Sequence, residues 1–111
     1  MALCSYGPVA LLGSGETAPA SGVIYERFAR RVQAPLRVAI FETPAGFQPN
    51  ATRVAAKIAE FLSSRLQNYQ PHFDLLPARR RGTADSPDNP ESTAAVCAAN
   101  MLFLGSGSPT Y

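Results

Sequence analysis

The 111-residue sequence predicts an α/β protein, a three-layer sandwich built around a parallel sheet of about four strands. Short, unbroken apolar runs alternate with longer stretches in which apolar residues recur at helical spacing. The short runs are typical of strands buried on both faces, and the longer stretches are typical of amphipathic helices. Glycine, proline or polar residues separate the two kinds of segment. The expected order is β-α-β-α-β-α-β, with right-handed crossovers between parallel strands.

The first third of the chain predicts one strand and one helix. The apolar run 9–12 ends at a glycine and is typical of a buried strand. A helix of about three turns follows from Ser21, a suitable N-cap, and ends before Pro35. Its apolar residues recur every four positions: Ile24, Phe28 and Val32.

The middle of the chain predicts a strand, a long helix and a second strand. Residues 36–41 form an apolar run that leads into the turn residues 42–46. Asn50 can cap the next helix, and Pro71 bounds it. Its apolar stripe consists of Val54, Ile58, Phe61, Leu62, Leu66 and Tyr69. Residues 72–76 then predict a shorter strand, nearer the edge of the sheet because its apolar residues partly alternate with polar ones.

The last third predicts a helix and a final strand. Residues 77–89 form a polar loop rich in Arg, Asp, Ser and Pro. Asn89 followed by Pro90 is a helix start, with proline in the first turn and a carboxylate next to it, near the positive end of the helix dipole. The alanine-rich residues 92–99 continue this helix, and residues 101–104 form the fourth strand.

Composition limits the class of protein. The length allows one domain, residues 1–111, and the formal net charge of +2 is too small to suggest a nucleic-acid partner. Cys4 and Cys97 lack metal-ligand spacing and are expected to be reduced, buried residues, which indicates a cytoplasmic protein without a metal site. The apolar runs are too short for a membrane span or a signal peptide, so no membrane partner is expected.

Candidate site residues follow the carboxyl ends of the expected strands, where open parallel sheets bind ligands. Two such ends carry the triplet Gly-Ser-Gly, at 13–15 and at 105–107. Glycine lets the backbone approach a ligand and present N–H donors, so the two loops form either a donor-rich cradle or simple tight turns. The candidate residues of the first two strand ends are Gly13, Gly15, Glu16 and Glu42.

Charged residues at these strand ends have two interpretations each. Glu16 and Glu42, at strand ends expected to be neighbours, either bind a cationic substrate or hold a loop through hydrogen bonds. Arg79–Arg81 either recognises a carboxylate or forms a solvated loop. His72 lies at the opposite strand terminus, so a structural or exposed role is expected for it. Neither Ser14 nor Ser106 fits a nucleophile elbow, and no Ser-His-Asp set occurs in a usable order.

A small-ligand or nucleotide-binding module that uses the loop Gly13–Gly15 is an alternative. Gly13–Ala18 fits the pattern G-x-G-x-x-G/A, and Glu42 ends the second strand, where a ribose-binding acid would lie. In a dinucleotide fold, however, Pro19 would fall inside the early turns of the helix. The better interpretation starts the helix after Ser21 and leaves 13–20 as a wider loop.

Several segments resemble one known group of proteins. Leu12–Glu16 (LGSGE), Glu42–Ala45 (ETPA) and Phe103–Ser108 (FLGSGS) are similar to strand ends of the cyanophycinase and aspartyl dipeptidase group of serine peptidases. That group belongs to the class I glutamine amidotransferase-like superfamily, which implies a flavodoxin-like sheet, here incomplete. The segments GSGET, ETPAGFQPN, ARRRGT and GSPTY also resemble uncharacterised bacterial amidotransferase-like proteins.

The resemblance implies a hydrolase that acts on peptide or amide bonds of a small peptide-like or amino-acid-derived substrate, without a cofactor. In these relatives the loop after the fourth strand donates a backbone N–H to the oxyanion hole. The corresponding candidates here are Gly105 and Gly107, with Ser106 and Ser108 contacting substrate. The nucleophile and histidine of the group come later in the chain, so this chain is expected to be an N-terminal part and inactive alone. A non-catalytic homologue is the remaining alternative.

The strand 101–104 is expected to lie at an edge of the sheet. An apolar edge strand with unpaired backbone groups favours pairing with another chain. We therefore expect a homodimer formed through this edge.

Overall fold

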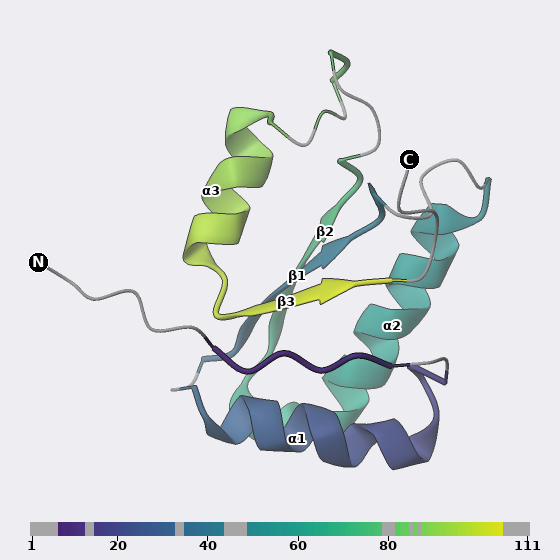
Figure 1. The fold of residues 1–111 in the computed structure, drawn as a ribbon, viewed down its shortest axis with the longest axis vertical. Helices are drawn as coiled ribbons and strands as arrows, with labels where there is room; N and C mark the ends of the chain where they lie inside the picture. Colours follow the sequence, from purple (N-terminus) through teal and green to yellow (C-terminus); the bar gives the residue numbers. More distant parts are fainter. Residues whose placement is uncertain are drawn as a thin grey trace, which may run out of the picture.

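A three-stranded parallel sheet forms the centre of the fold (Figure 1). The computed structural model describes residues 7–12, 15–32, 35–43, 49–78, 82–84, 86 and 88–105. Its strands are β1 (Arg37–Phe41), β2 (His72–Leu76) and β3 (Met101–Leu104), in the order β2-β1-β3. In register, Ile40 of β1 lies opposite Leu75 of β2 and Phe103 of β3. The expected α/β class with parallel strands is confirmed, and both outer strands lie at edges as expected.

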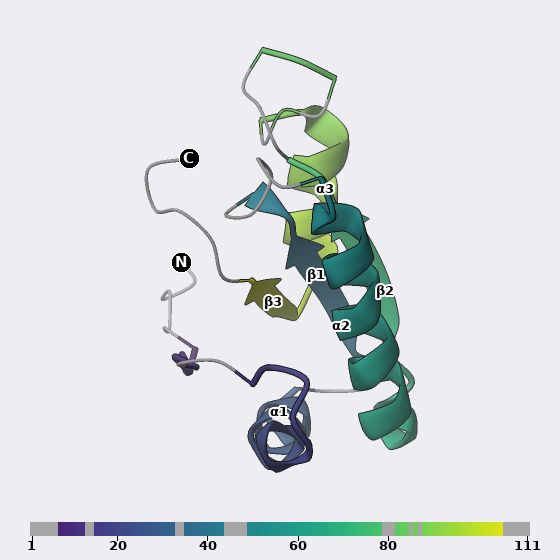
Figure 2. The same ribbon diagram turned by 90° about the vertical axis from the view of Figure 1, so that its right-hand side faces the viewer.

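In the part of the chain that the structure describes, three α-helices flank the sheet: α1 (Gly22–Arg30), α2 (Ala51–Arg65) and α3 (Pro90–Ala98). A short 3₁₀ turn, η1 (Pro19–Ser21), precedes α1, and another, η3 (Gln67–Tyr69), follows α2. The helices α1 and α2 contact each other and share one hydrophobic core, whereas α3 lies across the sheet from α2 (Figures 1 and 2). None of the described helices is long and apolar enough to cross a membrane.

The core lies between β1 and the helices α1 and α2. Val38 and Ile40 of β1 are buried and, as alternate residues of a strand, point to the same face of the sheet. They meet the apolar stripe of α2, in which the fully buried Leu62 follows Ile58 by one helical turn. The remaining residues of the predicted stripe are buried or packed against this core: Val54, Phe61, Leu66 and Tyr69. The stripe predicted for α2 is therefore confirmed.

The buried face of α1 differs from the predicted one. Tyr25 and Ala29 are its core residues, whereas Ile24, Phe28 and Val32 are only half-buried. The helix itself is short, and Gly22 at its start packs against the side chain of Arg65 of α2, which turns the Gly22 side toward the core. The predicted stripe consequently borders a groove described below.

The helix starts were predicted at the correct residues, but their caps differ. Asn89 accepts a hydrogen bond from the Glu91 backbone N–H at 3.0 Å, as expected for an N-cap. Asn50 precedes α2 without a side-chain capping bond. The Ser21 hydroxyl donates instead to the carbonyl oxygen of Gly15, at 2.8 Å. Ser21 thus holds the preceding loop and does not cap α1.

The strand expected over residues 9–12 is not formed. Residues 7–12 run beside β3 and in the same direction but pair with no strand (Figure 1). Val9 and Leu11 are 83% and 93% exposed, so the run also lacks the cover expected for a buried strand. A short apolar run becomes a strand only where a neighbouring backbone satisfies its polar groups, and here a groove separates it from β3. The expected β-α-β-α-β-α-β order is accordingly observed from the first helix onward.

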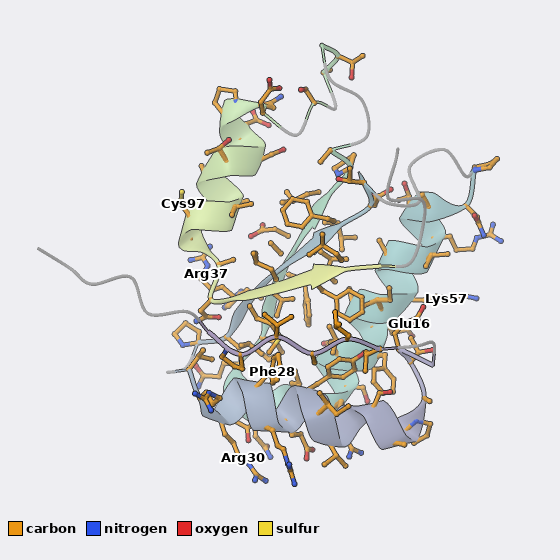
Figure 3. The ribbon with its side chains drawn as sticks, in the orientation of Figure 1. Glu16, Phe28, Arg30, Arg37, Lys57 and Cys97 are labelled. Atoms are coloured by element: carbon orange, nitrogen blue, oxygen red, sulfur yellow. The ribbon has the colours of Figure 1, made fainter. Side chains whose placement is uncertain are left out.

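The expectation of buried cysteines is wrong for Cys97. Its thiol is free and exposed on α3, a helix without any buried residue, and Figure 3 shows it pointing away from the sheet. The alanine-rich sequence of α3 gives it no strong apolar stripe that would select a buried side. Cys4 lies outside the described residues.

Candidate functional site

A groove of about 910 Å³ lies between residues 7–12, α1 and β3. We call it the β3 groove. Its apolar lining comes from residues 7–12, from α1 and from β3: Pro8, Val9, Ala10, Leu11, Leu12, Ile24, Phe28, Met101, Leu102, Phe103 and Leu104. Figure 3 shows Phe28 pointing from α1 toward the segment 7–12. The groove is therefore an apolar channel that follows the free edge of the sheet.

The backbone of β3 presents polar groups toward this groove. The Asn100 N–H donates to the Arg37 carbonyl oxygen at 2.9 Å, which fixes which side of the strand faces β1. Backbone N–H and C=O groups alternate in direction along a strand. Those of Leu102 therefore also point toward β1, and those of Met101 and Phe103 point toward the outer edge. No described strand pairs with that edge. Its N–H and C=O groups are available to an added chain.

The carboxyl end of the groove carries Glu16 and Gly105, both of which line it. Glu16 is the one charged residue among the described residues that form the lining. Gly15 adopts a φ of +73°, and two hydrogen bonds hold this turn in place. The Ser21 hydroxyl bonds the Gly15 carbonyl, and the Tyr25 hydroxyl donates to the Glu16 carbonyl oxygen at 2.6 Å. The structure thus brings together two residues that the sequence predicted for the site.

Tyr25 was not predicted as a site residue. Its ring is 5% exposed and stands edge-on to Phe61 at 6.1 Å, with Phe103 at 6.0 Å. Burial, and secondarily the negative charge of Glu16, raise the pKa of the Tyr25 phenol above its ordinary value of 10.0. The phenol therefore stays protonated and donates its hydrogen bond. Gly22, Tyr25 and Ala29 share the buried face of α1, and their helical spacing is a sequence signal that fits this face, although Ile24 and Phe28 have the same spacing.

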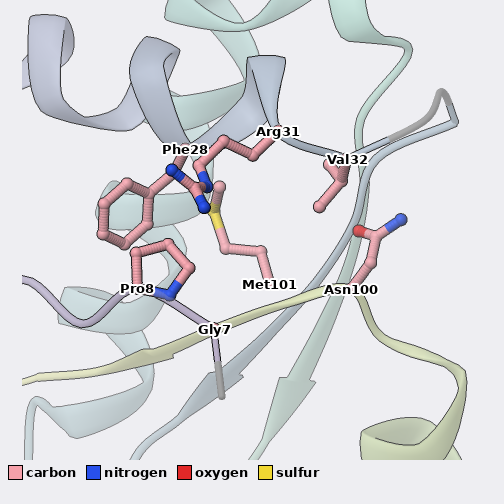
Figure 4. A pocket seen from close by; sticks show the side chains of 7 residues that line it. All are labelled: Gly7, Pro8, Phe28, Arg31, Val32, Asn100 and Met101. Carbon is pink, nitrogen blue, oxygen red and sulfur yellow. The ribbon is translucent and has the colours of Figure 1, made fainter. Parts of the chain in front are cut away.

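A second cavity of about 340 Å³ adjoins the amino end of the groove (Figure 4). Its lining shares Gly7, Pro8, Phe28 and Met101 with the groove. It adds Arg31, which follows the last residue of α1 and has no ion-pair partner among the described residues. A positive charge thus lies near one end of the β3 groove and a negative charge near the other.

Glu42 does not line the β3 groove. It is buried at the end of β1, and its Oε1 accepts a hydrogen bond from the Thr52 hydroxyl at 2.9 Å. The next residue, Thr43, donates its hydroxyl to the Ala78 carbonyl oxygen at 2.8 Å. These bonds tie the end of β1 to α2 and to the segment after β2. The geometry favours the loop-holding interpretation of Glu42.

The remaining predicted residues either lie apart from the groove or are not described. His72 is exposed at the start of β2, on the amino side of the sheet, whereas Gly105 follows the carboxyl end of β3. The other positions lie outside the described residues: Gly13, Ser14, Arg79, Arg80, Arg81, Ser106, Gly107 and Ser108. The one histidine in the sequence is thus placed away from the candidate oxyanion residue.

The chain matches no family model, no curated protein and no solved structure. Functional inference consequently depends on the geometry of the groove and on the chemistry of its lining residues.

Proposed function

We propose that the β3 groove is one wall of a hydrolase active site for peptide or amide bonds, with Gly105 as an oxyanion donor. One observation carries this proposal: Gly105 lines the carboxyl end of a groove whose long wall is an unpaired strand edge. The backbone N–H groups of Met101 and Phe103 point outward, and the same alternation continued one residue beyond β3 would turn the Gly105 N–H in this direction too. A carbonyl oxygen seated at that end of the groove would meet this donor. The proposal is that of a cyanophycinase- or dipeptidase-like hydrolase.

A single well-aimed donor is a large part of such a site. Removing one oxyanion-hole donor from an enzyme costs about 2.7–4 kcal/mol of transition-state stabilisation. Hydrolysis also needs a nucleophile and a base, and His72 lies at the opposite end of the strands. We therefore expect this chain alone to be inactive, with the nucleophile and histidine coming from residues outside it.

Binding of a transition-state analogue tests the donor without requiring turnover. The probe is a tetrapeptide in which a tetrahedral phosphonate replaces one amide, compared with the unmodified tetrapeptide by calorimetry. Because oxyanion donors bind a tetrahedral anion better than a carbonyl, we expect the phosphonate to bind at least about tenfold more tightly. Equal affinities for the two peptides would refute the oxyanion role and favour a non-catalytic homologue.

Two substitutions at one position supply the control. Gly105→Pro removes the N–H and should abolish the preference for the phosphonate. Gly105→Ala keeps the N–H, and a Cβ built at this position meets no atom within 4 Å, so the preference should survive. The oxyanion role therefore requires that Gly105→Pro loses the preference for the phosphonate peptide while Gly105→Ala keeps it.

The nucleotide-binding alternative has less support from the geometry. Phosphate sites of that kind use the N-terminus of a helix that begins within the glycine motif. Here α1 begins at Gly22, after the 3₁₀ turn Pro19–Ser21. Calorimetry with ATP and NAD at millimolar concentration tests this alternative directly, and we expect no binding heat.

A further inference from the structure

We propose that the β3 groove binds a short extended peptide with free termini, which adds as an antiparallel strand to β3. Its ammonium group would pair with Glu16, and its carboxylate would pair with Arg31. This inference rests on the proposed function, because it names the substrate class and the two residues that select it. Three properties of the groove support it: its free edge, the segments that line it opposite that edge and the charges near its ends.

The edge of β3 is unprotected. Natural edge strands carry charged residues or proline that discourage pairing with another chain. The opposite edge strand, β2, contains His72 and Asp74, whereas β3 reads Met-Leu-Phe-Leu. Leu102 and Leu104 are 51% and 62% exposed on it. Main-chain pairing to such an edge supplies affinity, and the apolar lining favours apolar side chains on the added strand.

The far wall of the groove limits the size of the occupant. Residues 7–12 and α1 line the groove together with β3, so a chain that pairs with this edge would lie between β3 and these two segments. A single extended chain fits this arrangement better than the sheet edge of a second folded copy does. The four residues of β3 span about 13 Å, the length of a peptide of about four residues.

The charges near the two ends set the direction of the peptide. Glu16 lines the carboxyl end of the groove, and its carboxylate makes no hydrogen bond or ion pair with a described residue. Arg31 borders the cavity at the amino end of β3 (Figure 4). An ammonium at Glu16 and a carboxylate at Arg31 orient the peptide opposite to β3. Antiparallel pairing is also slightly more stable per residue than parallel pairing.

The test uses the full chain and the probe Leu-Val-Thr-Val with free termini. Binding is measured by calorimetry, and protection of individual amides is measured by hydrogen exchange and NMR. We expect exchange at Met101 and Phe103 to slow when the peptide binds, because their N–H groups become strand donors. Acetylating the peptide's amine should weaken binding about fivefold, and so should amidating its carboxylate, in line with partly exposed ion pairs.

Matched variants separate the two ends. In Glu16→Gln the acetylated and free peptides should bind equally, and in Arg31→Gln the amidated and free peptides should do so. Glu60→Gln and Lys57→Gln change exposed residues of α2 that do not line the groove, and should leave both ratios unchanged. Acetylation that weakens binding equally in Glu16→Gln and the native chain would overturn the assignment of the ammonium site.

Other outcomes distinguish this inference from the proposed function. Peptide binding with slowed exchange at Met101 and Phe103, but no phosphonate preference, would support the groove as a peptide site and refute the oxyanion role. A phosphonate preference without protection of these amides would support the oxyanion role and refute the addition of the peptide as a strand to β3. Concentration-dependent sedimentation, with protection of the same amides in the absence of peptide, would show that a second copy occupies the edge and would overturn the inference.

Discussion

Replacing Tyr25 by Phe tests how the wall of the β3 groove is held. The substitution keeps the buried ring and its contacts with Phe61 and Phe103 but removes the hydroxyl that donates to the Glu16 carbonyl. An ordinary hydrogen bond contributes about 0.5–1.5 kcal/mol, so we expect the free energy of unfolding to fall by about 1 kcal/mol. For a chain of this length that loss lowers the Tm by about 4 °C.

The pH dependence of stability provides a second measurement on the same variant. The native pKa of Tyr25 is raised above 10.0, so the folded state retains a proton that the unfolded state loses. Stability from this group is complete below pH 10.0 and is lost as the pH rises through the raised native pKa. Tyr25→Phe should remove this component and flatten the decline of stability above pH 10.0.

Urea denaturation followed by circular dichroism at pH 7 and above pH 10 measures both effects. Tyr69→Phe is the matched control, because Tyr69 is half-buried and its hydroxyl bonds to no described residue. That control should change stability by a few tenths of a kcal/mol at most. If Tyr25→Phe is as stable as the native chain and shows the same alkaline decline, the hydroxyl does not hold the Glu16 turn.

Three further predictions concern the core, a helix cap and the free thiol. Leu62→Ala, at a side chain with 0% exposure, should cost about 2–5 kcal/mol in urea denaturation, and a cost below 1 kcal/mol would contradict the assigned core. Asn89→Ala should cost about 0.5–2 kcal/mol of stability through loss of the cap on α3, whereas Asn50→Ala, which removes no capping bond, should cost less. A larger loss for Asn50→Ala than for Asn89→Ala in the same denaturation series would contradict these caps. The exposed thiol of Cys97 should react with a maleimide in the folded chain about as fast as the thiol of a free peptide does, as followed by mass spectrometry of the labelled peptide. A much slower reaction would contradict the exposed position of Cys97 on α3.

The elements with strong periodicity and clear boundaries could be predicted from the sequence. The bounds of β2 and β3 agree with the predicted runs 72–76 and 101–104. The apolar stripe of α2 extends over four turns, and Pro71 limits it, so a prediction from helical spacing is well determined. The start of α3 was also predictable, because Asn89 and Pro90 both act locally, through a side-chain cap and a fixed φ.

Features that depend on distant contacts could not be predicted in the same way. Whether residues 9–12 form a strand depends on a partner backbone, which a run of four apolar residues does not specify. The buried face of α1 depends on the contact between Gly22 and Arg65 of α2. In a helix this short, Ile24 and Phe28 fit a core face as well as Tyr25 and Ala29 do.

The candidate site also combines residues that could be predicted from the sequence with residues whose position depends on distant contacts. Glu16 and Gly105 were predicted because each follows an apolar run, and the ends of parallel strands meet at one edge of a sheet. Gly105 does follow the strand β3, whereas Glu16 follows a run that forms no strand but lies beside β3 across the groove. Arg31 and Tyr25 lie within or just after a helix, where the sequence pattern predicts only an exposed charge and an aromatic residue. Their relation to the groove depends on how α1 lies against β3.

The most direct test of the groove as an active-site wall is the NMR spectrum of the ¹⁵N-labelled chain titrated with the phosphonate tetrapeptide. We predict that the Gly105 amide shows one of the largest shift changes, together with Met101 and Phe103, and that Gly105→Ala retains this pattern. Shift changes confined to residues away from the groove, or no change at saturating peptide, would contradict the account.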